Sequence, residues 1–426
     1  MSGPAARSPA LHLGMDNGSL VSYRLWKDIV KRESDLQAEK QVTGPMMPTT
    51  DLMELEKRPV GRPPAKQREI VDALRGQIVA GRLTPGARVP TRAKIERRFK
   101  ASPLTVQRAM NALIRDGFVR AEPRGTFVCD RPPHLRRYGM VFHSNPQDEG
   151  NWRQFYSALL REAADLQQRA GIEIPAYYDI NDRVNPREHR HLLADLRAHR
   201  LAGVVLLTNS NAVLRTLARL PDMPAVSLLI GDHPKAPRFP GVAPDYGVFF
   251  DRAVAYLAQQ QRRRIALIVS AVQYRAIGGH FEAAMLRHGL DIARQRIQMP
   301  GLSEPEGAEN AAHLLFHAEQ NARPDGLIVA DDNFVRHAVR GLMSAGIRVP
   351  GDLVVVAHAN FPSPDAPALP IRRLGFHARD VLETCVRLIG DQRRQPGVPL
   401  PEITRIPAVF EDEAERAAPT AAKVAP

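Results

Sequence analysis

The stretch ASPLTVQRAMNALIR, residues 101–115, carries the sharpest local pattern in the 426-residue chain. Ser102 is a good helix N-cap residue, and Pro103 suits the first helical turn. One face of the predicted helix is apolar because these residues recur at helical spacing: Val106, Ala109, Met110 and Leu113. The opposite face carries Thr105, Gln107, Arg108 and Asn111. The stretch therefore predicts an amphipathic helix with one polar side.

Regular elements are also predicted on both sides of this helix. Residues 91–99 (TRAKIERRF) predict a short helix, separated from the first by a gap that suits a tight turn. Residues 67–78 predict a longer helix, with a glycine in the position of a C-terminal cap. Residues 118–121 and 126–129 are strand candidates joined by a short turn. The order predicted is two helices, a turn, a third helix and a β-hairpin.

Positive charge is concentrated in this part of the chain. The sequence has 59 Lys and Arg against 46 Asp and Glu, a formal net charge of +13. Residues 62–137 hold 18 basic and 6 acidic residues, so they account for +12 of that charge. Such a concentration favours a polyanionic partner. Because the polar helix face carries groups that can donate to phosphates or reach base edges, we expect the partner to be double-stranded DNA.

The remaining composition limits the cellular context. Cys129 and Cys385 lie far apart and have no metal-ligand spacing, which excludes a disulfide scaffold and fits a reducing compartment. The first residues lack the apolar core of a signal peptide, and the longest apolar runs are too short to span a membrane. We therefore expect a cytoplasmic protein with no membrane contact.

Composition and pattern divide the chain into five segments. Residues 1–60 are expected to be a disordered tail, apart from a possible short helix over 23–39, and residues 413–426 a second tail. Residues 61–130 form the basic module, and 131–137, in a Pro-containing stretch that breaks helix and strand, form a linker. Residues 138–412 form the large domain. KRPVGRPPAK, residues 57–66, resembles half of an AT-hook and equally fits a plain basic linker.

In residues 138–412 short apolar runs alternate with amphipathic helical stretches. The runs lie at 139–142, 203–207, 225–230, 264–270, 326–330 and 353–357. Helical patterns lie between them, for example at 155–170, 246–260 and 333–345. Apolar runs without polar alternation, separated by helices, predict parallel sheets that are buried on both faces. Both one large sheet and two similar lobes fit this length.

The basic module resembles the winged helix-turn-helix domain of GntR-type bacterial regulators. The resemblance covers IVAGRLTPGARVPTRAKIERRFKASPLTVQRAMNALIRDGFVRAEPRGTFV, residues 78–128. It implies DNA contacts from the second helix, the recognition helix and the wing: Thr91, Arg92, Ser102, Thr105, Gln107, Arg108, Arg124, Gly125 and Thr126. Pro103 and Gln107 stand where many family members have basic residues, so the DNA sequence recognised is left open.

The large domain resembles the effector-binding domain of lactose-repressor-type regulators, which shares the fold of periplasmic sugar-binding proteins. The features that carry the resemblance include GMVFHSN from residue 139, VAPDY from residue 242 and DGLIVADD from residue 325. The resemblance implies an α/β fold with two parallel-sheet lobes and a ligand cleft at the carboxyl ends of the strands. Ala359 and Asn360 replace the acidic pair usual in the family.

Residues at these strand ends are the ligand candidates, because aromatic rings can stack on a sugar and polar side chains can bind its hydroxyls. They are His143, Ser144, Trp152, Phe155, Asp232, Asp245, Tyr246, Arg275, Asp332 and Asn360.

No catalytic pattern is present in the sequence. It has no phosphate-binding loop, no GxSxG motif and no dinucleotide fingerprint, so we expect no enzyme activity and no cofactor. Glu188, His189 and His191 could suggest a metal, but flanking arginines favour a solvated charged helix.

The combined pattern predicts a transcription regulator, with repression expected over activation. One winged helix reads a short half-site, so we expect a homodimer on a palindromic operator. The effector is expected to be a small polar molecule such as a sugar. Two alternatives stay open: a solute-binding protein, and a regulator fused to an enzyme domain such as a pyridoxal-phosphate aminotransferase.

Overall fold

The computed structural model describes residues 65–148, 152–182, 186–208, 210–229, 239–320, 322–363, 366–395 and 398–417. The expected tail over 1–60 and the possible helix at 23–39 lie outside the described residues. The same is true of most of the AT-hook-like stretch, of Asp232 and of residues 418–426.

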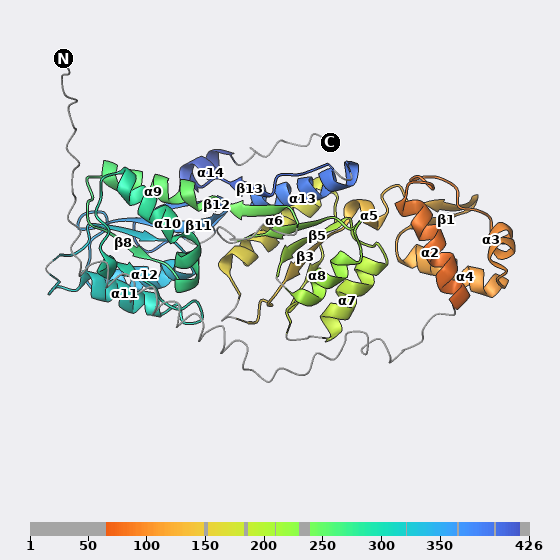
Figure 1. Cartoon of the computed structure of the whole chain (residues 1–426), viewed down its shortest axis with the longest axis horizontal. Coiled ribbons are helices and arrows are strands. Elements are labelled where there is room, and N and C mark those ends of the chain that lie inside the picture. Colours follow the sequence, from red (N-terminus) through yellow and green to blue (C-terminus); the bar gives the residue numbers. More distant parts are fainter. Residues whose placement is uncertain are drawn as a thin grey trace, which may run out of the picture. The chain divides into compact units, whose positions relative to one another are not determined.

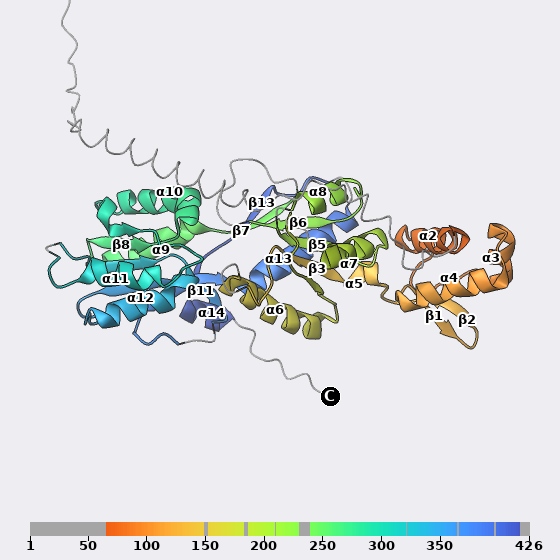
Figure 2. The same cartoon turned by 90° about the horizontal axis from the view of Figure 1, so that it is seen from below.

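The basic module folds as three helices and a two-stranded wing. The helices are α2 (Ala65–Val79), α3 (Arg92–Phe99) and α4 (Pro103–Arg115). Strands β1 (Val119–Glu122) and β2 (Gly125–Val128) pair antiparallel, and Figure 2 shows this hairpin extending beside α4. The apolar faces predicted from periodicity meet in one core, where Ile70, Val106 and Leu113 are fully buried. The predicted winged helix is therefore confirmed.

A short helix follows the wing. The stretch 130–137 was expected to form neither helix nor strand, and this is wrong, because α5 spans Pro133–Arg136. Pro133 stands at its first turn, where proline is tolerated because the missing N–H has no intrahelical partner. Proline therefore starts this helix instead of breaking it.

The first lobe of the large domain is built on a six-stranded parallel sheet in the order β13-β7-β6-β5-β3-β4. Its strands are β3 (Tyr138–Phe142), β4 (Ala176–Tyr177), β5 (Gly203–Leu207), β6 (Ala225–Leu228), β7 (Gly241–Pro244) and β13 (Ile403–Ile406). Helices α6 (Gln154–Ala170) and α13 (Ala378–Arg394) pack on one face. Helices α7 (Pro186–Arg197) and α8 (Asn211–Ala218) cover the other.

The second lobe repeats this plan with the order β14-β12-β11-β10-β8-β9, in which only β14 runs antiparallel to its neighbour. Its strands are β8 (Ile265–Ile268), β9 (Ile297–Gln298), β10 (Gly326–Val329), β11 (Val354–Phe361), β12 (Arg372–His377) and β14 (Val409–Phe410). Helices α9 (Tyr246–Gln259) and α10 (Ala271–Arg287) pack on one face. Helices α11 (Gly307–Phe316) and α12 (Asp332–Ser344) cover the other, as Figure 1 shows.

The chain crosses between the lobes three times. It passes to the second lobe after β7, returns with α13 and β13, and crosses again to β14. The last helix, α14 (Glu411–Ala417), follows β14 and includes residues that were assigned to the C-terminal tail. Arg252 on α9 holds this helix, because its Nη2 donates to both carboxylate oxygens of Glu413, at 2.6 and 2.8 Å. Two parallel-sheet lobes, one of the two architectures considered, are thus confirmed.

Candidate DNA interface and effector site

The recognition helix α4 begins where its capping residue predicts. The Ser102 hydroxyl accepts a hydrogen bond from the Thr105 backbone N–H at 3.3 Å and lies 2.9 Å from the Thr105 hydroxyl. Pro103 occupies the first turn. The cap satisfies one backbone donor at the helix N-terminus, and the other donors there suit a phosphate oxygen.

The outer face of α4 presents polar groups to solvent. Arg108 is exposed, and Gln107 donates through Nε2 to the Asn111 Oδ1 at 2.7 Å. This bond orients the Gln107 amide along the helix face. Leu104 is also 59 % exposed at the helix start, although it is apolar. An exposed apolar side chain beside polar ones suits a thymine methyl group next to base-edge acceptors.

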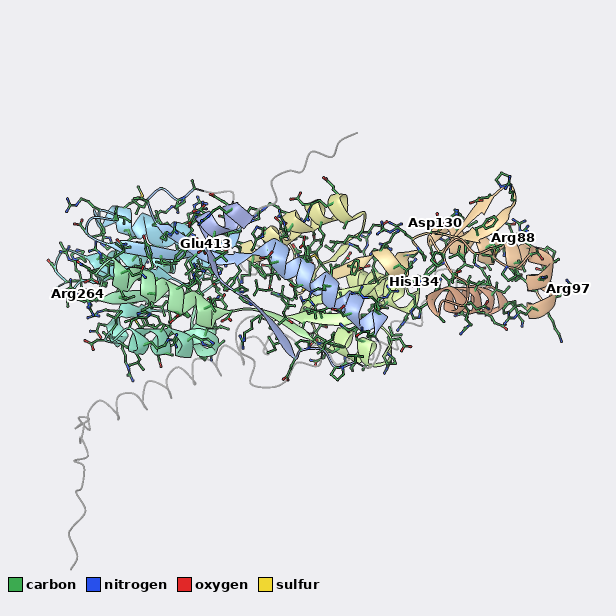
Figure 3. All side chains as sticks on the ribbon, turned by 90° about the horizontal axis from the view of Figure 1, so that it is seen from above. Arg88, Arg97, Asp130, His134, Arg264 and Glu413 are labelled. Carbon is green, nitrogen blue, oxygen red and sulfur yellow. The ribbon has the colours of Figure 1, made fainter. Side chains whose placement is uncertain are left out.

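The helix before the turn is set by Thr91, whose hydroxyl accepts from the Lys94 backbone N–H at 3.4 Å. Arg92 stands at its first turn and is exposed. Arg97 and Arg98, in the last turn, are also exposed, and Figure 3 labels Arg97.

The wing contains a contact that the sequence analysis missed. The backbone of Arg88 forms an isolated antiparallel β-bridge with Phe127 of strand β2. The Arg88 guanidinium donates to the Arg124 carbonyl oxygen at 2.8 Å. Gly125, with φ of 137°, lets this arginine approach, because a Cβ there would lie 3.0 Å from Arg88 Nε. Arg88 and Arg124 therefore place two cations at the turn of the wing.

The charges of this module are unevenly paired. Arg75 and Arg120 lie within 4 Å of carboxylates, at Asp116 and Glu122 among others. Among the described residues, no carboxylate lies within 4 Å of these exposed cations: Arg88, Arg92, Lys94, Arg97, Arg98, Lys100, Arg108 and Arg124. The uncompensated charge thus lies on α3, α4 and the wing, the elements from which the DNA contacts were predicted.

In the first lobe, candidate ligand residues join an aromatic cluster behind β3. The Trp152 ring lies 5.3 Å from Phe142 and 5.2 Å from Tyr156, between ring centroids. Its indole N–H donates to Ser157 at 2.8 Å. Tyr178, a member the sequence analysis missed, packs 5.6 Å from Phe142. The cluster makes a rigid apolar wall at the carboxyl end of the sheet.

Polar residues lie beside this wall. His143 Nδ1 lies 3.2 Å from the Leu207 carbonyl oxygen, and Asn181 Nδ2 donates to the His143 carbonyl at 2.8 Å. Ser144 is buried, and Phe155 is half-buried on the first turn of α6. Burial of the Tyr156 side chain raises the pKa of its hydroxyl to about 12, so it stays protonated and can donate.

In the second lobe, acidic and amide groups gather where β10 and β11 end. Asn360 Nδ2 donates to Asp332 Oδ2 at 2.6 Å, and Asn333 donates from its backbone and side chain to Asp331 Oδ1 at 2.9 and 2.6 Å. Burial raises the pKa of Asp332 to about 6. Burial, aided by the neighbouring Asp332, also raises the pKa of Asp331. Two predicted residues, Asp332 and Asn360, are therefore brought together.

His358, which the sequence analysis missed, lies near Asp331 of the acidic pair Asp331 and Asp332. It is only 6 % exposed, and neither ring nitrogen has a hydrogen-bond partner in the described part of the chain. Its ring packs among Tyr246, Phe249 and Phe376, with centroids 5.5 to 6.3 Å away. Burial lowers the pKa of His358 to about 4, against the opposing effect of Asp331. The apolar run that predicted strand β11 ended at Ala357, one residue before His358, whereas the strand continues to Phe361.

The two lobes touch through Gln154, the first residue of α6. Its backbone N–H donates to Asn333 Oδ1 at 3.2 Å, and its side-chain amide lies 3.4 Å from the Asp332 carbonyl oxygen. Trp152 lies two residues before Gln154 in the chain, and Phe155 follows it directly. The aromatic wall of the first lobe and the acidic cluster of the second are therefore adjacent.

Three other candidates take different positions. Tyr246 is 5 % exposed in an aromatic core with Phe249 and Phe376, and burial raises the pKa of its hydroxyl. Asp245 caps α9 through the Val248 N–H at 3.0 Å and lines a surface hollow of about 360 Å³ with His280 and Arg287. Arg275 is exposed on α10.

His189 and His191, which were considered as metal ligands, were expected to lie together on a solvated helix face, and they do not. His189 is 2 % exposed, while the His191 ring packs 5.7 Å from Tyr177. Within the described residues no three His, Cys, Asp or Glu side chains are grouped to hold a metal ion. None of the helices that the structure describes is long and apolar enough to cross a membrane.

A winged helix joined to a two-lobed parallel-sheet domain defines a class of one-component transcription regulators. Comparison with family models supports both halves: residues 66–128 match bacterial regulatory proteins of the gntR family, and residues 254–411 match the periplasmic binding protein-like domain. The chain is thus a DNA-binding transcription regulator, as predicted, in which a domain that matches gntR-family regulators is followed by a domain that matches the periplasmic binding protein-like domain.

Solved structures share the fold of the large domain. A proposed LacI transcriptional regulator from Bacillus cereus subsp. cytotoxis NVH 391-98 matches with a TM-score of 0.51 and 15% identity, covering 65% of this chain and 96% of that one. A LacI family transcriptional regulator from Enterococcus faecium, with bound ribose, matches with a TM-score of 0.50 and 17% identity, covering 65% and 97%. A comparison with curated proteins gave no match.

Proposed function

We propose that the protein is a cytoplasmic repressor whose operator affinity is controlled by a sugar or sugar derivative held between the two lobes. The observation that carries the ligand class is the pairing of an aromatic wall around Trp152 with the Asp332–Asn360 pair, joined through Gln154. Sugars combine an apolar ring face with outward hydroxyl groups. A stacking surface opposite paired acceptors and donors therefore suits them.

We infer that the ligand contacts come from both lobes. The first lobe supplies His143, Ser144, Trp152 and Phe155, and the second supplies Asp332 and Asn360. Ribose bound to the Enterococcus faecium regulator is consistent with this ligand class. Ligand controls DNA affinity only if it binds two arrangements of the protein unequally, and contacts from two lobes provide such a difference when the lobes open or close.

The DNA contacts come from the predicted residues of α3, α4 and the wing, together with Arg88. The proposed boundaries for separate expression are 61–130 for the DNA-binding domain and 138–417 for the effector domain, so that the predicted end at residue 412 is moved to keep helix α14 whole. The cations that have no carboxylate partner on these elements would neutralise phosphates, while Gln107 would read a base edge.

The active form is a homodimer on a palindromic operator. The exposed apolar residues Leu314 and Met343, 62 % and 54 % exposed, are the proposed contact points between subunits. They belong to adjacent helices, since the neighbouring His313 Nδ1 lies 3.1 Å from the Ser344 hydroxyl. A two-fold axis would bring each such patch against its copy. Replacing both residues by serine should then produce monomers in analytical ultracentrifugation.

A thermal-shift screen tests the ligand class. Monosaccharides, disaccharides, sugar acids and sugar phosphates are added to the full-length protein, and a ligand at 100 times its Kd should stabilise the fold by about 2.7 kcal/mol. The same compound should change operator affinity. Asp332→Asn should reduce the shift, whereas Asp352→Asn, an exposed aspartate paired with Arg348 in the same lobe, should leave it intact. A screen without any shift would refute the sugar proposal.

A further inference from the structure

A chain of alternating charges joins the DNA-binding domain to the first lobe. Asp116, at the end of α4, accepts from Arg75 Nη2 at 2.9 Å through one carboxylate oxygen and from Arg200 Nη1 at 3.1 Å through the other. Arg200 Nε in turn lies 2.8 Å from Asp195 Oδ1, and Asp195 accepts from the Tyr177 hydroxyl. We call Arg75, Asp116, Arg200 and Asp195 the relay.

The relay is largely withdrawn from water. The side chains of Arg75, Asp116 and Asp195 are 9 %, 8 % and 4 % exposed, and that of Arg200 is 25 % exposed. Charges in such surroundings are held only where each has a partner of opposite sign. Asp116 is the shared member, because one carboxylate serves an arginine of each domain. A change in the position of α4 therefore acts directly on Arg200.

The position of Arg200 is fixed by the end of α7. His199 adopts the left-handed conformation, with φ of 47°, and turns the chain back on the helix. The Arg200 backbone N–H then donates to the Asp195 carbonyl oxygen at 2.9 Å. The guanidinium is thereby aimed from the lobe toward Asp116 by backbone bonds as well as by charge.

A second contact runs beside the relay. The Arg75 guanidinium lies 5.4 Å above the ring of Phe118, which stacks on His134 at 5.8 Å. His134 belongs to α5, and its carbonyl oxygen accepts from Arg393 on α13. Phe118 itself is fully buried. Phe118, just after α4, therefore packs between Arg75 of the DNA-binding domain and His134 of α5.

The relay and the DNA surface occupy opposite ends of α4. Ser102 and Thr105 lie at the N-terminal end, whereas Asp116 caps the C-terminal end. A 13-residue helix is about 20 Å long at 1.5 Å per residue. DNA can therefore bind the first end while the relay holds the second, and force on one is transmitted to the other by a rigid helix.

We propose that Arg200 is a positioning residue for DNA recognition, which couples the orientation of helix α4 to helix α7 of the first lobe through Asp116. The proposal rests on the proposed function as a DNA-binding regulator. Because coupling between two sites is reciprocal, DNA bound at α4 must restrain α7 if α7 controls α4.

Hydrogen exchange of the full-length protein tests this coupling without knowledge of the effector or operator. The probe is a random-sequence duplex of about 30 base pairs at low salt, where charge alone supports binding. In the unsubstituted protein, DNA should slow amide exchange in α4 and also in residues 192–200, the latter by about five-fold. In Arg200→Gln, DNA should still protect α4, but the protection of residues 192–200 should be lost. Arg200→Lys, which reaches one carboxylate at a time, should restore it in part.

Arg200→Gln is expected to fold with a lower Tm, because Asp116 keeps its ion pair with Arg75 and Asp195 keeps the hydrogen bond from the Tyr177 hydroxyl. The matched control is Arg169→Gln, which removes an exposed arginine paired with Glu383 in the same lobe and should behave like the unsubstituted protein. If DNA protects residues 192–200 equally in Arg200→Gln, or fails to protect them in the unsubstituted protein while α4 is protected, the positioning role is overturned. If α4 itself gains no protection, the proposed function fails and the positioning role fails with it.

A measurement without DNA separates these two failures. In a double-mutant cycle of melting temperature, Asp116→Asn and Arg200→Gln together should lower Tm by less than the sum of the single changes. Arg200→Gln combined with the distant Glu383→Gln should be additive. Additive behaviour of Asp116→Asn and Arg200→Gln would overturn the relay itself, whatever DNA does.

Discussion

The DNA-binding domain and the effector domain use their polar residues in opposite ways. On α3, α4 and the wing, cations such as Arg92, Arg108 and Arg124 are exposed. Where the two lobes meet, polar side chains are already bonded to one another, as in the pair of half-buried Asp332 and buried Asn360. The exposed cations suit a large polyanion, whereas the fixed hydrogen-bonding groups suit a small polar molecule.

The difference follows from the cost of desolvation. Phosphate groups stay partly hydrated, so exposed arginines can neutralise them without being buried first. A small polar ligand gains little from charge in water, so its partners must be fixed and shielded, which shifts their pKa values. Asp332 and His358, with pKa values moved to about 6 and about 4, carry this signature, and both belong to the effector domain.

The largest expected difference between the two domains is in how their charged residues affect the salt dependence of DNA binding. If about six phosphates are neutralised, the slope of log affinity against log salt is roughly −5, and DNA affinity falls about 10³-fold between 50 and 200 mM salt. Arg124→Gln should reduce the slope by about 1. Arg348→Gln removes the same charge from the effector domain and should leave the slope unchanged. Fluorescence anisotropy over a salt series measures this, and a flat profile would contradict the electrostatic contrast.

Acid should act on the effector domain through His358. Its pKa in the folded protein, about 4, lies below the value of about 6.5 expected when unfolded, so the unfolded chain takes up a proton first. The free energy of unfolding therefore falls as pH drops from 6.5 toward 4, by at most about 3 kcal/mol. Asp332, with its raised pKa of about 6, acts in the opposite sense, since its contribution is lost as pH rises through 6.

His358→Phe isolates the first effect, because the aromatic bed of Tyr246, Phe249 and Phe376 suits a phenyl ring. Urea denaturation of this variant should show less loss of stability between pH 6.5 and 4. Replacement of the exposed His317 by alanine serves as the control. An unchanged pH profile in His358→Phe would show that this histidine titrates as it does in water.

Within the DNA-binding domain, Gln107→Ala should reduce sequence preference, whereas Arg108→Ala should reduce affinity for all sequences. If Gln107 reads a base edge, its loss costs about 1–3 kcal/mol on the operator and relaxes the preference at one position in each half-site. Loss of a phosphate contact at Arg108 weakens all sequences alike. Competition binding on operator and random duplexes compares them. Equal losses for Gln107→Ala on both duplexes would show that it contacts the backbone.

The smallest effect compares two helix caps. Ser102 caps α4 and Ser270 caps α10, each through a backbone N–H three residues on. Replacing either by alanine should cost about 1 kcal/mol of stability. Only Ser102→Ala should also weaken DNA binding, because its cap lies in the DNA surface. Weaker DNA binding in Ser270→Ala as well would show that the effector domain transmits general destabilisation to the winged helix.

Local signals were enough to predict the DNA-binding domain. A capping serine, a first-turn proline and four apolar residues at helical spacing determine where α4 begins and which face it buries, and neighbours in sequence form these contacts. Arg88 escaped prediction because its approach to the wing depends on Gly125, a residue 37 positions later.

Strand ends in the large domain were predicted less well. The apolar run that predicted β11 stopped at Ala357, because the polar His358 interrupts the run, although the strand continues through His358 and Asn360. Tyr246 was selected for its place after a strand, yet Phe249 and Phe250 at helical spacing already indicated a buried face. Which polar residues meet across two lobes depends on contacts far apart in sequence, such as Gln154 with Asn333.

The triple crossing between lobes also governs how the protein is made. The sheet of the first lobe has β13, residues 403–406, beside β7, and its inner face is covered by α13. A growing chain therefore cannot finish its first lobe until residue 406 has left the ribosome, although the winged helix is complete by residue 128. Since domains fold as units during synthesis, the DNA-binding domain can fold early, while the first lobe still lacks α13 and the strand that pairs with β7. Nascent-chain aggregation and chaperone demand should accordingly arise from the effector domain.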